Sequence, residues 1–394
     1  MEPAAKSPAI LKKSAPWRVE SMALATLSAI ETEWRDLAAR ALHANIFYEP
    51  DFARAAAPVF GAHAKAVLVR DDGCALRGLF PFQNPSFRYG AISGLVMGWM
   101  HPYMTLGVPL IDRDHADAIL EIWLDHLRQT QNARFLLLPQ IPMESAFWQN
   151  LQRVLRNRDL AFATFDSHQR ASLAPRPEAR TDYLTRALNP KIRKELSRKR
   201  RRLSDLGEVR HEILEDPIAM QTVLRDFLNL EQQGWKGRKG TAVAENDDLR
   251  QFVERAVADL GHRGQARIDR LSAGGRALAV SILLRSGGKA WLWKITYDEA
   301  FARLSPGVQL TCDVTASLLR DDGLIETDSC ALPDHPMIDR LWRERIALSD
   351  LLIALRPNDR AGFRLACALE TLRRGARHKA KSALHRIAAM RGAD

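Results

Sequence analysis

Helical and strand-like segments alternate along this chain, and the same order occurs in each half. In the first half, a helical apolar period over 28–57 precedes AKAVLVR and LRGLFPFQ, two strand-like segments joined by the turn at 71–73. In the second half, ARIDRLSAGGRALAVSILLRS and KAWLWKITYD correspond to them. A strand, a helix and another strand follow each pair. This order predicts an α/β (α+β) chain of two halves with similar plans.

The length of 394 residues is enough for two domains, each with its own core. APRPEAR follows the strand-like FATFDSHQRASL and is typical of a linker, so we expect a domain boundary near residue 175. The predicted parts are a mobile arm at 1–16, a first domain at 17–175, a second domain at 176–350 and a basic helical tail at 351–394.

The formal net charge is +11, and basic residues concentrate in 191–202 and 356–391. In the first of these segments, apolar residues recur at helical spacing, which predicts one helix with a solvated basic face; phosphate or tRNA contact is the alternative. The tail is amphipathic and either docks on its own domain or contacts an anionic membrane surface weakly. No apolar run approaches the roughly 20 residues of a membrane span, and the start lacks a signal peptide, so we predict a cytoplasmic protein.

The most informative segment is KAWLWKITYDEAFARLSPGVQLTCDVTASLLR, in which a strand, a short loop and a helix follow one another. Pro306 suits the first helical turn, and Ser305 is a residue type that caps helices. A helix start offers unpaired backbone N–H groups, and Gly307 has no Cβ to keep a diphosphate away. The segment therefore predicts either a phosphate-binding helix start or an ordinary Ser-Pro start with glycine in its first turn.

Five stretches resemble the GNAT superfamily of acyltransferases: LRGLFPFQ, LNLEQQGWKGRKGTA, RALAVSILLR, KITYDEAFARLSPGVQL and LIETDS. The resemblance spans roughly residues 30–350. It is strongest to the two-domain branch linked to cellulose and exopolysaccharide biosynthesis (the CelD/BcsL type), and the chain is also similar to the peptidoglycan-modifying FemAB transferases. Unlike the several glycines usual in a GNAT pyrophosphate loop, this chain offers Ser305 and Gly307.

The resemblance implies two tandem GNAT-like domains, each a mixed, mostly antiparallel sheet flanked by helices, with the first lobe free of cofactor. It implies acetyl-CoA or another acyl-CoA as co-substrate, and no metal is required. The residues expected to bind this cofactor are Lys294, Ile295, Ser305, Pro306, Gly307, Val308, Gln309 and Leu310.

Transfer of an acyl group to an amine requires a neutral amine and a proton for the departing thiolate. Asp328, at the end of the LIETDS strand, is the first candidate for the base, and a turn-forming aspartate is the alternative. Glu231 is the second candidate, and Tyr297 is the candidate proton donor, unless it is only packed. The loop after Glu231 carries Trp235, Lys236 and Arg238, which we expect to bind the substrate unless this is a solvated loop at a helix end.

Three functions compete at this point. The first is an acyl-CoA-dependent N-acyltransferase, most simply an acetyltransferase, that acts on a small-molecule or saccharide amine in polysaccharide or cell-envelope biosynthesis. The second is a FemAB-like transferase that takes aminoacyl-tRNA as its donor. The third is a non-catalytic module that binds nucleic acid or a membrane surface. The sequence leaves the acceptor, the acyl length and the oligomeric state open.

Overall fold

The computed structural model describes residues 17–85, 88 and 94–391, so the predicted arm at 1–16 lies outside the described residues. The first half contains, in order, β1 (Arg18–Ala23), α1 (Glu31–Ala39), α2 (Pro50–Phe60), β2 (Lys65–Arg70), β3 (Leu76–Gln83), β4 (Leu95–Gly98), β5 (Leu110–Ile111), α3 (Ala116–Gln129), β6 (Phe135–Pro142), α4 (Ala146–Asn157) and β7 (Phe162–Leu173). The alternation of helices and strands predicted for this half is confirmed.

The second half repeats the alternation. Its elements are α5 (Tyr183–Ala187), α6 (Pro190–Leu203), β8 (Val209–Leu214), α7 (Pro217–Gln233), α8 (Trp235–Arg238), α9 (Asp247–Gly261), β9 (Ala266–Ala273), β10 (Arg276–Ser286), β11 (Lys289–Tyr297), α10 (Pro306–Leu318), β12 (Glu326–Asp328), α11 (Ile338–Leu341), β13 (Glu344–Ala354) and α12 (Arg360–Arg391).

Side-chain caps explain where several of these helices begin. Ser145 precedes α4 and accepts a hydrogen bond from the Trp148 amide at 3.2 Å. Asn189, Asp216 and Asn246 cap α6, α7 and α9 in the same way. Each cap satisfies an amide that has no partner inside the helix, which favours a helix start at that residue.

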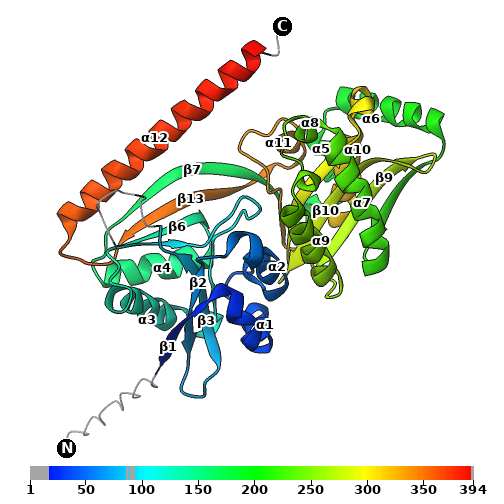
Figure 1. The fold of residues 1–394 in the computed structure, drawn as a ribbon. Coiled ribbons are helices and arrows are strands. Elements are labelled where there is room, and N and C mark those ends of the chain that lie inside the picture. The colour runs from blue at the N-terminus through cyan, green and yellow to red at the C-terminus, as the bar shows by residue number, and fades with distance from the viewer. Residues whose placement is uncertain (1–16, 86–87, 89–93, 392–394) are drawn as a thin grey trace, which may run out of the picture.

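The two predicted sheets are joined edge to edge. In the described part of the chain, thirteen strands form one mixed sheet in the order β1-β2-β3-β4-β6-β13-β7-β12-β11-β10-β9-β8, and β5 pairs with β3. Pairing is parallel between β4 and β6 and between β11 and β12, and antiparallel elsewhere. The long strands β7 and β13 run from one half towards the other (Figure 1), and β7 pairs with β12 through Leu173 and Ser172.

Strand β13 differs from the sequence-based expectation. It crosses the boundary predicted between residues 350 and 351, and it pairs with β6 and β7 of the first half. The chain therefore returns from the second half to complete the first, because the edge between β6 and β7 needs a partner. The helix of the tail, α12, begins at Arg360 and not at residue 351. In the apolar segment MTLGVPLI (104–111), which has the composition of a strand, only residues 110–111 form one.

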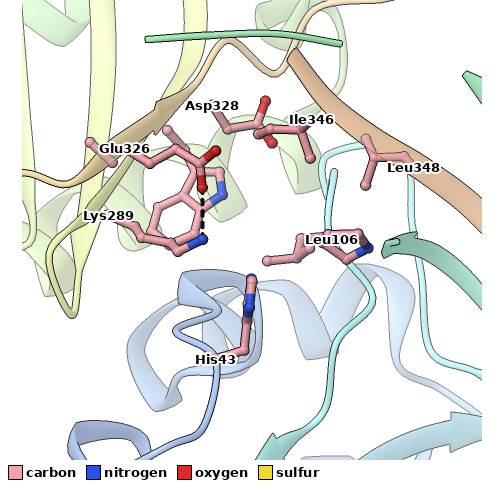
Figure 2. A pocket seen from close by; sticks show the side chains of 10 residues that line it. His43, Leu106, Lys289, Glu326, Asp328, Ile346 and Leu348 are labelled. Carbon is pink, nitrogen blue, oxygen red and sulfur yellow. Dashed lines mark hydrogen bonds and ion pairs between the residues drawn. The ribbon is translucent and has the colours of Figure 1, made fainter. Parts of the chain in front are cut away.

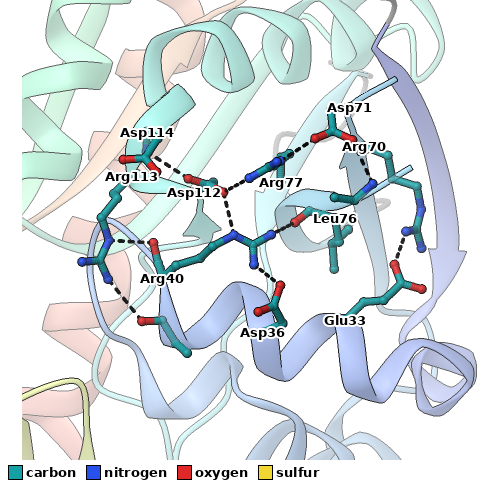
Figure 3. Close-up of polar contacts among 12 residues, drawn as sticks. Glu33, Asp36, Arg40, Arg70, Asp71, Leu76, Arg77, Asp112, Arg113 and Asp114 are labelled. Atoms are coloured by element: carbon teal, nitrogen blue, oxygen red, sulfur yellow. Dashed lines mark hydrogen bonds and ion pairs between the residues drawn. The ribbon is translucent and has the colours of Figure 1, made fainter. Parts of the chain in front are cut away.

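A buried carboxylate in the first half links helix α1 to strand β3. Asp112 is fully buried and accepts hydrogen bonds at 2.7 Å from both Arg40 of α1 and Arg77 of β3, as Figure 3 shows. Burial raises the pKa of Asp112, but the two guanidinium groups and the Asp114 amide outweigh it and hold the pKa below its usual value.

The two halves share one hydrophobic core. Helix α2 of the first half packs on α9 of the second, and Phe52 meets Phe252 and Trp293 edge-on at 5.5 Å between ring centroids. His101 stacks on Phe60 at 4.2 Å, and burial lowers its pKa to about 3. Since no solvent layer separates these aromatic rings, the contact fixes the first half against β11. Within the described residues, no helix is both long and apolar enough to cross a bilayer.

Candidate functional site

Strand β11 has one edge that is only partly paired. It pairs with β12 in parallel register at residues 289–291 and then continues to Tyr297 beside β10 alone. The chain leaves β12 at Asp328, and Cys330 adopts a left-handed conformation with φ 53°. The two strands therefore diverge, and the backbone of 292–297 faces the space between them.

A β-bulge determines which way Lys294 points. Ile282 of β10 pairs with Lys294, whereas its neighbour Leu283 pairs with Leu292, so Trp293 is the extra residue. Residues that pair across an antiparallel ladder point to the same face of the sheet. Ile282 and Trp293 both belong to the core on the α7 side. The bulge therefore places the Lys294 side chain on that face, where simple alternation from Trp293 would have sent it to the other.

Lys294 lies in a small cluster of charged and aromatic groups. Its ammonium lies 4.4 Å from the centroid of the Tyr103 ring, and burial lowers its pKa to about 8, although the charge of Glu231 acts in the opposite direction. Glu231 on α7 is buried, binds the Lys236 ammonium at 2.5 Å and accepts from the Val243 amide at 2.8 Å. This cluster brings together three predicted site residues, Glu231, Lys236 and Lys294, although Lys294 was expected at the cofactor site.

The same cluster keeps Glu231 ionised. Burial acts to raise the pKa of Glu231, but the positive charges of Lys294 and Lys236 and two hydrogen bonds lower it overall. A lysine of lowered pKa beside a permanent carboxylate can exchange protons near neutral pH. The arrangement is therefore chemically suited to accept a proton from an ammonium group.

Helix α8 connects this cluster to the segment before α10. The Trp235 amide donates to Glu299 at 2.7 Å, and the Arg238 guanidinium binds the other carboxylate oxygen of Glu299 at 2.6 Å. The Trp235 side chain is half exposed and carries the Lys239 ammonium over its ring. Trp235 and Arg238 thus lie on the same short helix as Lys236 of the cluster, and Glu299, which the sequence did not single out, fixes this helix.

Two backbone amides at the start of α10 have no acceptor inside the helix, and Pro306 and Gly307 are themselves buried. The first intrahelical hydrogen bond runs from the Gln309 amide to the Ser305 carbonyl, which leaves the Gly307 and Val308 amides without an intrahelical acceptor. Ser305 has φ 54° and makes no side-chain cap; its hydroxyl accepts from Lys199 of α6 at 2.9 Å instead. Lys199 lies on the helix whose cations the sequence predicted to be solvated.

The other residues predicted at the cofactor site are placed differently. Leu310 is fully buried among the residues that α10 packs on the sheet, and Ile295 packs against the same group. Gln309 is buried and donates to the Leu304 carbonyl at 2.8 Å. The side chains of Leu310 and Ile295 are therefore part of the packing, and the side chain of Gln309 is held by the segment before α10.

Tyr297 lies at the helix start and not in the Lys294 cluster. A Cβ added at Gly307 would lie 3.1 Å from Cδ1 of Tyr297, so the ring packs directly on the glycine. Tyr297 follows Lys294 by three residues, which separates them by roughly 10 Å along a strand and directs them to opposite faces. The predicted proton donor is thus next to the predicted phosphate site.

Asp328 belongs to a separate group at the junction of the halves. It binds Arg170 of β7 at 2.9 Å and accepts from the Cys330 amide at 2.8 Å. Arg170 also donates to the Thr105 carbonyl and to Gln140, so the pair ties β7, β6 and the 101–109 loop to β12. Burial raises the pKa of Asp328, and the charge of Arg170 offsets this only in part.

Beside Asp328 lies a cavity of about 30 Å³, which Figure 2 shows in close-up. His43 enters it from the first half, and Lys289 pairs with Glu326 at 2.7 Å in its wall. Burial, and to a smaller extent the charge of Lys289, lowers the pKa of His43 to about 3. A cavity of this size suits water and is too small for a substrate.

Sequence reasoning missed Tyr103, Lys199, Arg170 and Glu299 as parts of these groups. Tyr103 and Arg170 come from the first half, which was predicted to lack a cofactor, and no local pattern marks them. Lys199 is one cation among many in its helix. Within the described residues, no group of three or more His, Cys, Asp or Glu side chains is arranged for a metal ion.

Comparison with known proteins adds a family. Residues 190–330 match the family model described as an acetyltransferase (GNAT) domain, the segment that holds α6 to β12. No curated protein matches the sequence significantly.

Solved structures resemble the chain over most of its length. The C-terminal domain of a putative lysylphosphatidylglycerol synthetase from Agrobacterium fabrum aligns with TM-score 0.54 at 11% identity, covering 88% of this chain and 97% of that one. FemX aligns with TM-score 0.53 at 10% identity over 82% of this chain and 95% of its own. A conserved protein of unknown function from Bacteroides thetaiotaomicron aligns with TM-score 0.52 at 10% identity, covering 87% of this chain and 100% of that one. At such low identity these likenesses concern the fold alone.

Proposed function

Since this chain belongs to the GNAT superfamily of acyltransferases, with residues 190–330 as its recognised domain, we propose that it is an N-acyltransferase that uses an acyl-CoA, most simply acetyl-CoA. The observation that carries the proposal is the edge of β11 at 292–297, which has no strand partner among the described residues and leads through residues 298–305 to the start of α10, where two amides have no intrahelical acceptor. An extended thioester can lie along this edge with its phosphates at the helix.

The donor phosphates would bind at the beginning of α10. The Gly307 and Val308 amides and the positive end of the helix dipole favour a diphosphate there. Lys199 adds a cation on one side, held by Ser305, and the Tyr297 ring closes the other side. In this proposal Tyr297 contacts the phosphate-bearing part of the donor, because it lies at the helix start.

The acceptor amine would react beside Lys294. Backbone N–H groups on the free edge of β11 polarise the thioester carbonyl, the amine nitrogen forms a bond to the carbonyl carbon, and the C–S bond then breaks. An acceptor ammonium loses two protons in forming the amide: neutral Lys294 takes the first and passes it to solvent, and the second ends on the CoA thiol. Glu231 stabilises the transient Lys294 ammonium, and Tyr103 covers it from the first half.

Asp328 receives a different role in this proposal. Both of its carboxylate oxygens are already engaged, one by Arg170 and the other by the Cys330 amide. We therefore assign Asp328 to holding the 101–109 loop against the second half. Trp235, Lys236 and Arg238, on the helix that joins the cluster through Lys236, are proposed to contact the acceptor.

The resemblance to the CelD/BcsL branch suggests a saccharide amine in polysaccharide or cell-envelope synthesis as acceptor. A second candidate function is transfer from aminoacyl-tRNA, as in the FemAB transferases. The observation that favours it is α6, whose cations Lys191, Lys194, Arg198, Arg201 and Arg202 are exposed on the helix that reaches the start of α10.

Thermal unfolding with and without acyl-CoA tests the proposal. At a ligand concentration about 100 times the dissociation constant, binding adds about 2.7 kcal/mol and raises Tm by on the order of 5 °C. A Gly307→Glu variant places a carboxylate at the diphosphate site and should abolish the shift. Gly307→Ala adds the Cβ without the charge, so it controls for crowding against Tyr297 and should keep most of the shift.

The two donors are separated by the same variants. If no acyl-CoA shifts Tm in folded protein, while aminoacyl-tRNA binds with a steep salt dependence, the second candidate replaces the first. If neither binds, the donor site is not at α10.

A further inference from the structure

Helix α12 has one face that docks on the first half. Phe363, Ala366 and Glu370 are buried, and Phe363 packs with Phe135 and Leu352 of the sheet. Glu370 binds Arg88 at 2.6 Å and Arg374 at 2.6 Å. The helix then continues beyond the body of the protein, as Figure 1 shows, so only its first part is anchored.

The opposite face of the same helix is apolar and exposed. Leu365 and Leu372 are 52% and 69% exposed, although a protein interior would readily accept leucine. They belong to a stripe that repeats at intervals of three and four residues, which places its members on one side of a helix. The exposed stripe consists of Ala361, Leu365, Ala368, Leu372 and Ala376.

The charged side chains that this helix itself places beside the stripe are cationic. Arg360 and Arg364 are exposed along one side of it, and Lys379 follows it. Arg360 also lies 3.6 Å from Asp159 of the first half, and both side chains of this pair are exposed. The sequence of 360–391 contains a single acidic residue, Glu370, and that carboxylate is buried on the docked face. The exposed face is therefore apolar with a cationic margin and has no negative charge of its own in the described part of the helix.

We infer that this face of α12 docks on the surface of an anionic lipid bilayer, with Leu365 and Leu372 inserted below the headgroups and the cations among the lipid phosphates. An apolar stripe flanked by cations is the pattern of helices that lie in a membrane interface. This inference is independent of the proposed acyltransferase activity, because it uses no residue of that site.

The charge and the apolar character of this face disfavour two other partners, a second copy of the chain and nucleic acid. A second copy would bring two strongly basic helices together with no acidic residue to pair with them, which is unfavourable. Nucleic acid would satisfy the cations but would leave both leucines in water, because a phosphate backbone offers them no apolar surface. An anionic lipid surface meets both features.

Vesicle co-sedimentation of the full chain tests the inference. Wild-type protein should bind vesicles of phosphatidylcholine with about one third phosphatidylglycerol, bind phosphatidylcholine alone far more weakly, and be released at high salt. An Arg360→Gln and Arg364→Gln double variant should partition about fivefold less per cation removed. A Leu365→Glu and Leu372→Glu double variant should lose at least about tenfold.

Ile218→Glu is the matched control, because Ile218 is an equally exposed apolar residue on α7, far along the chain from α12. It should bind vesicles like the wild type. All four residues changed on α12 are exposed, so circular dichroism and Tm should be unchanged. Light scattering without lipid measures the mass of each variant. Equal binding to both vesicle types, wild-type binding by the leucine variant, or a dimer that this variant dissociates would each overturn the inference.

Discussion

Replacement of Lys294 by methionine tests the most unusual feature of the site, a lysine whose pKa burial lowers from 10.5 to about 8. At about 1.4 kcal/mol per pKa unit, this drop corresponds to about 3 kcal/mol of unfavourable free energy for the charged form in the folded state. Methionine has nearly the same length and carries no proton. The variant therefore removes this titration and keeps most of the packing against Trp293 and Tyr103.

The sign follows from proton binding. Between pH 8 and pH 10.5 the unfolded chain holds the Lys294 proton and the folded protein does not, so the free energy of unfolding rises with pH. Above pH 10.5 both states have lost the proton and the gain in stability is complete. Below pH 8 both states hold it, and the folded state bears the full cost of the buried charge. The difference in unfolding free energy between wild type and Lys294→Met should therefore rise by about 3 kcal/mol across the range.

Urea unfolding at a series of pH values and constant ionic strength measures this difference. Other groups titrate in the same range, but they are common to both proteins and cancel. Loss of the Lys294 charge next to Glu231 adds an offset that does not change with pH, since the carboxylate is ionised throughout. Lys65→Met, on an exposed position of β2, is the control. A wild-type to Lys294→Met difference that stays constant with pH would refute the burial of this amine.

Three further predictions concern neighbouring groups. Glu231→Gln removes the negative charge that raises the pKa of Lys294, so the rising limb of the pH–rate profile should move to lower pH. A limb that moves to higher pH or stays in place contradicts the assignment of Lys294 as base. Arg170→Met leaves Asp328 buried without its partner and should reduce the free energy of unfolding by about 3–5 kcal/mol in urea titrations, while Arg170→Met with Asp328→Asn should recover part of it. Lys199→Met loses the bond to Ser305 and should raise KM for the donor severalfold with kcat retained; a change in kcat alone would place Lys199 outside the donor site.

Local patterns were sufficient for most of the elements. Helix α7 begins after its Asp216 cap and ends at Gln233, where the apolar period stops at Gly234, as the sequence indicated. Apolar period, caps and turns act between residues close in the chain, so their effect is visible in the sequence. The strand–loop–helix from β11 to α10 was predicted for the same reason, and the match of 190–330 to the GNAT domain agrees with it.

Strand β13 shows where local patterns are insufficient. Its residues were divided between a domain and a tail, because nothing in 344–354 states which strands it will pair with. Pairing is decided by which sheet edge is free when the chain returns from the second half. The strand expected over 104–111 was wrong for a related reason. The apolar residues of this segment are buried, but only Leu110 and Ile111 pair with another strand.

For the candidate site, the sequence by itself determined the residue types and their order: Glu231 near Lys236, a strand ending at Tyr297, and Ser305-Pro306-Gly307 at a helix start. Only the tertiary structure decided which of them meet. A bulge at Trp293 places the Lys294 side chain on the same face as Glu231. Tyr103 of the first half contacts the Lys294 ammonium, and Arg170 forms an ion pair with Asp328. These contacts join residues far apart in the chain, and burial, which sets the pKa of each group, exists only once the two halves have packed together.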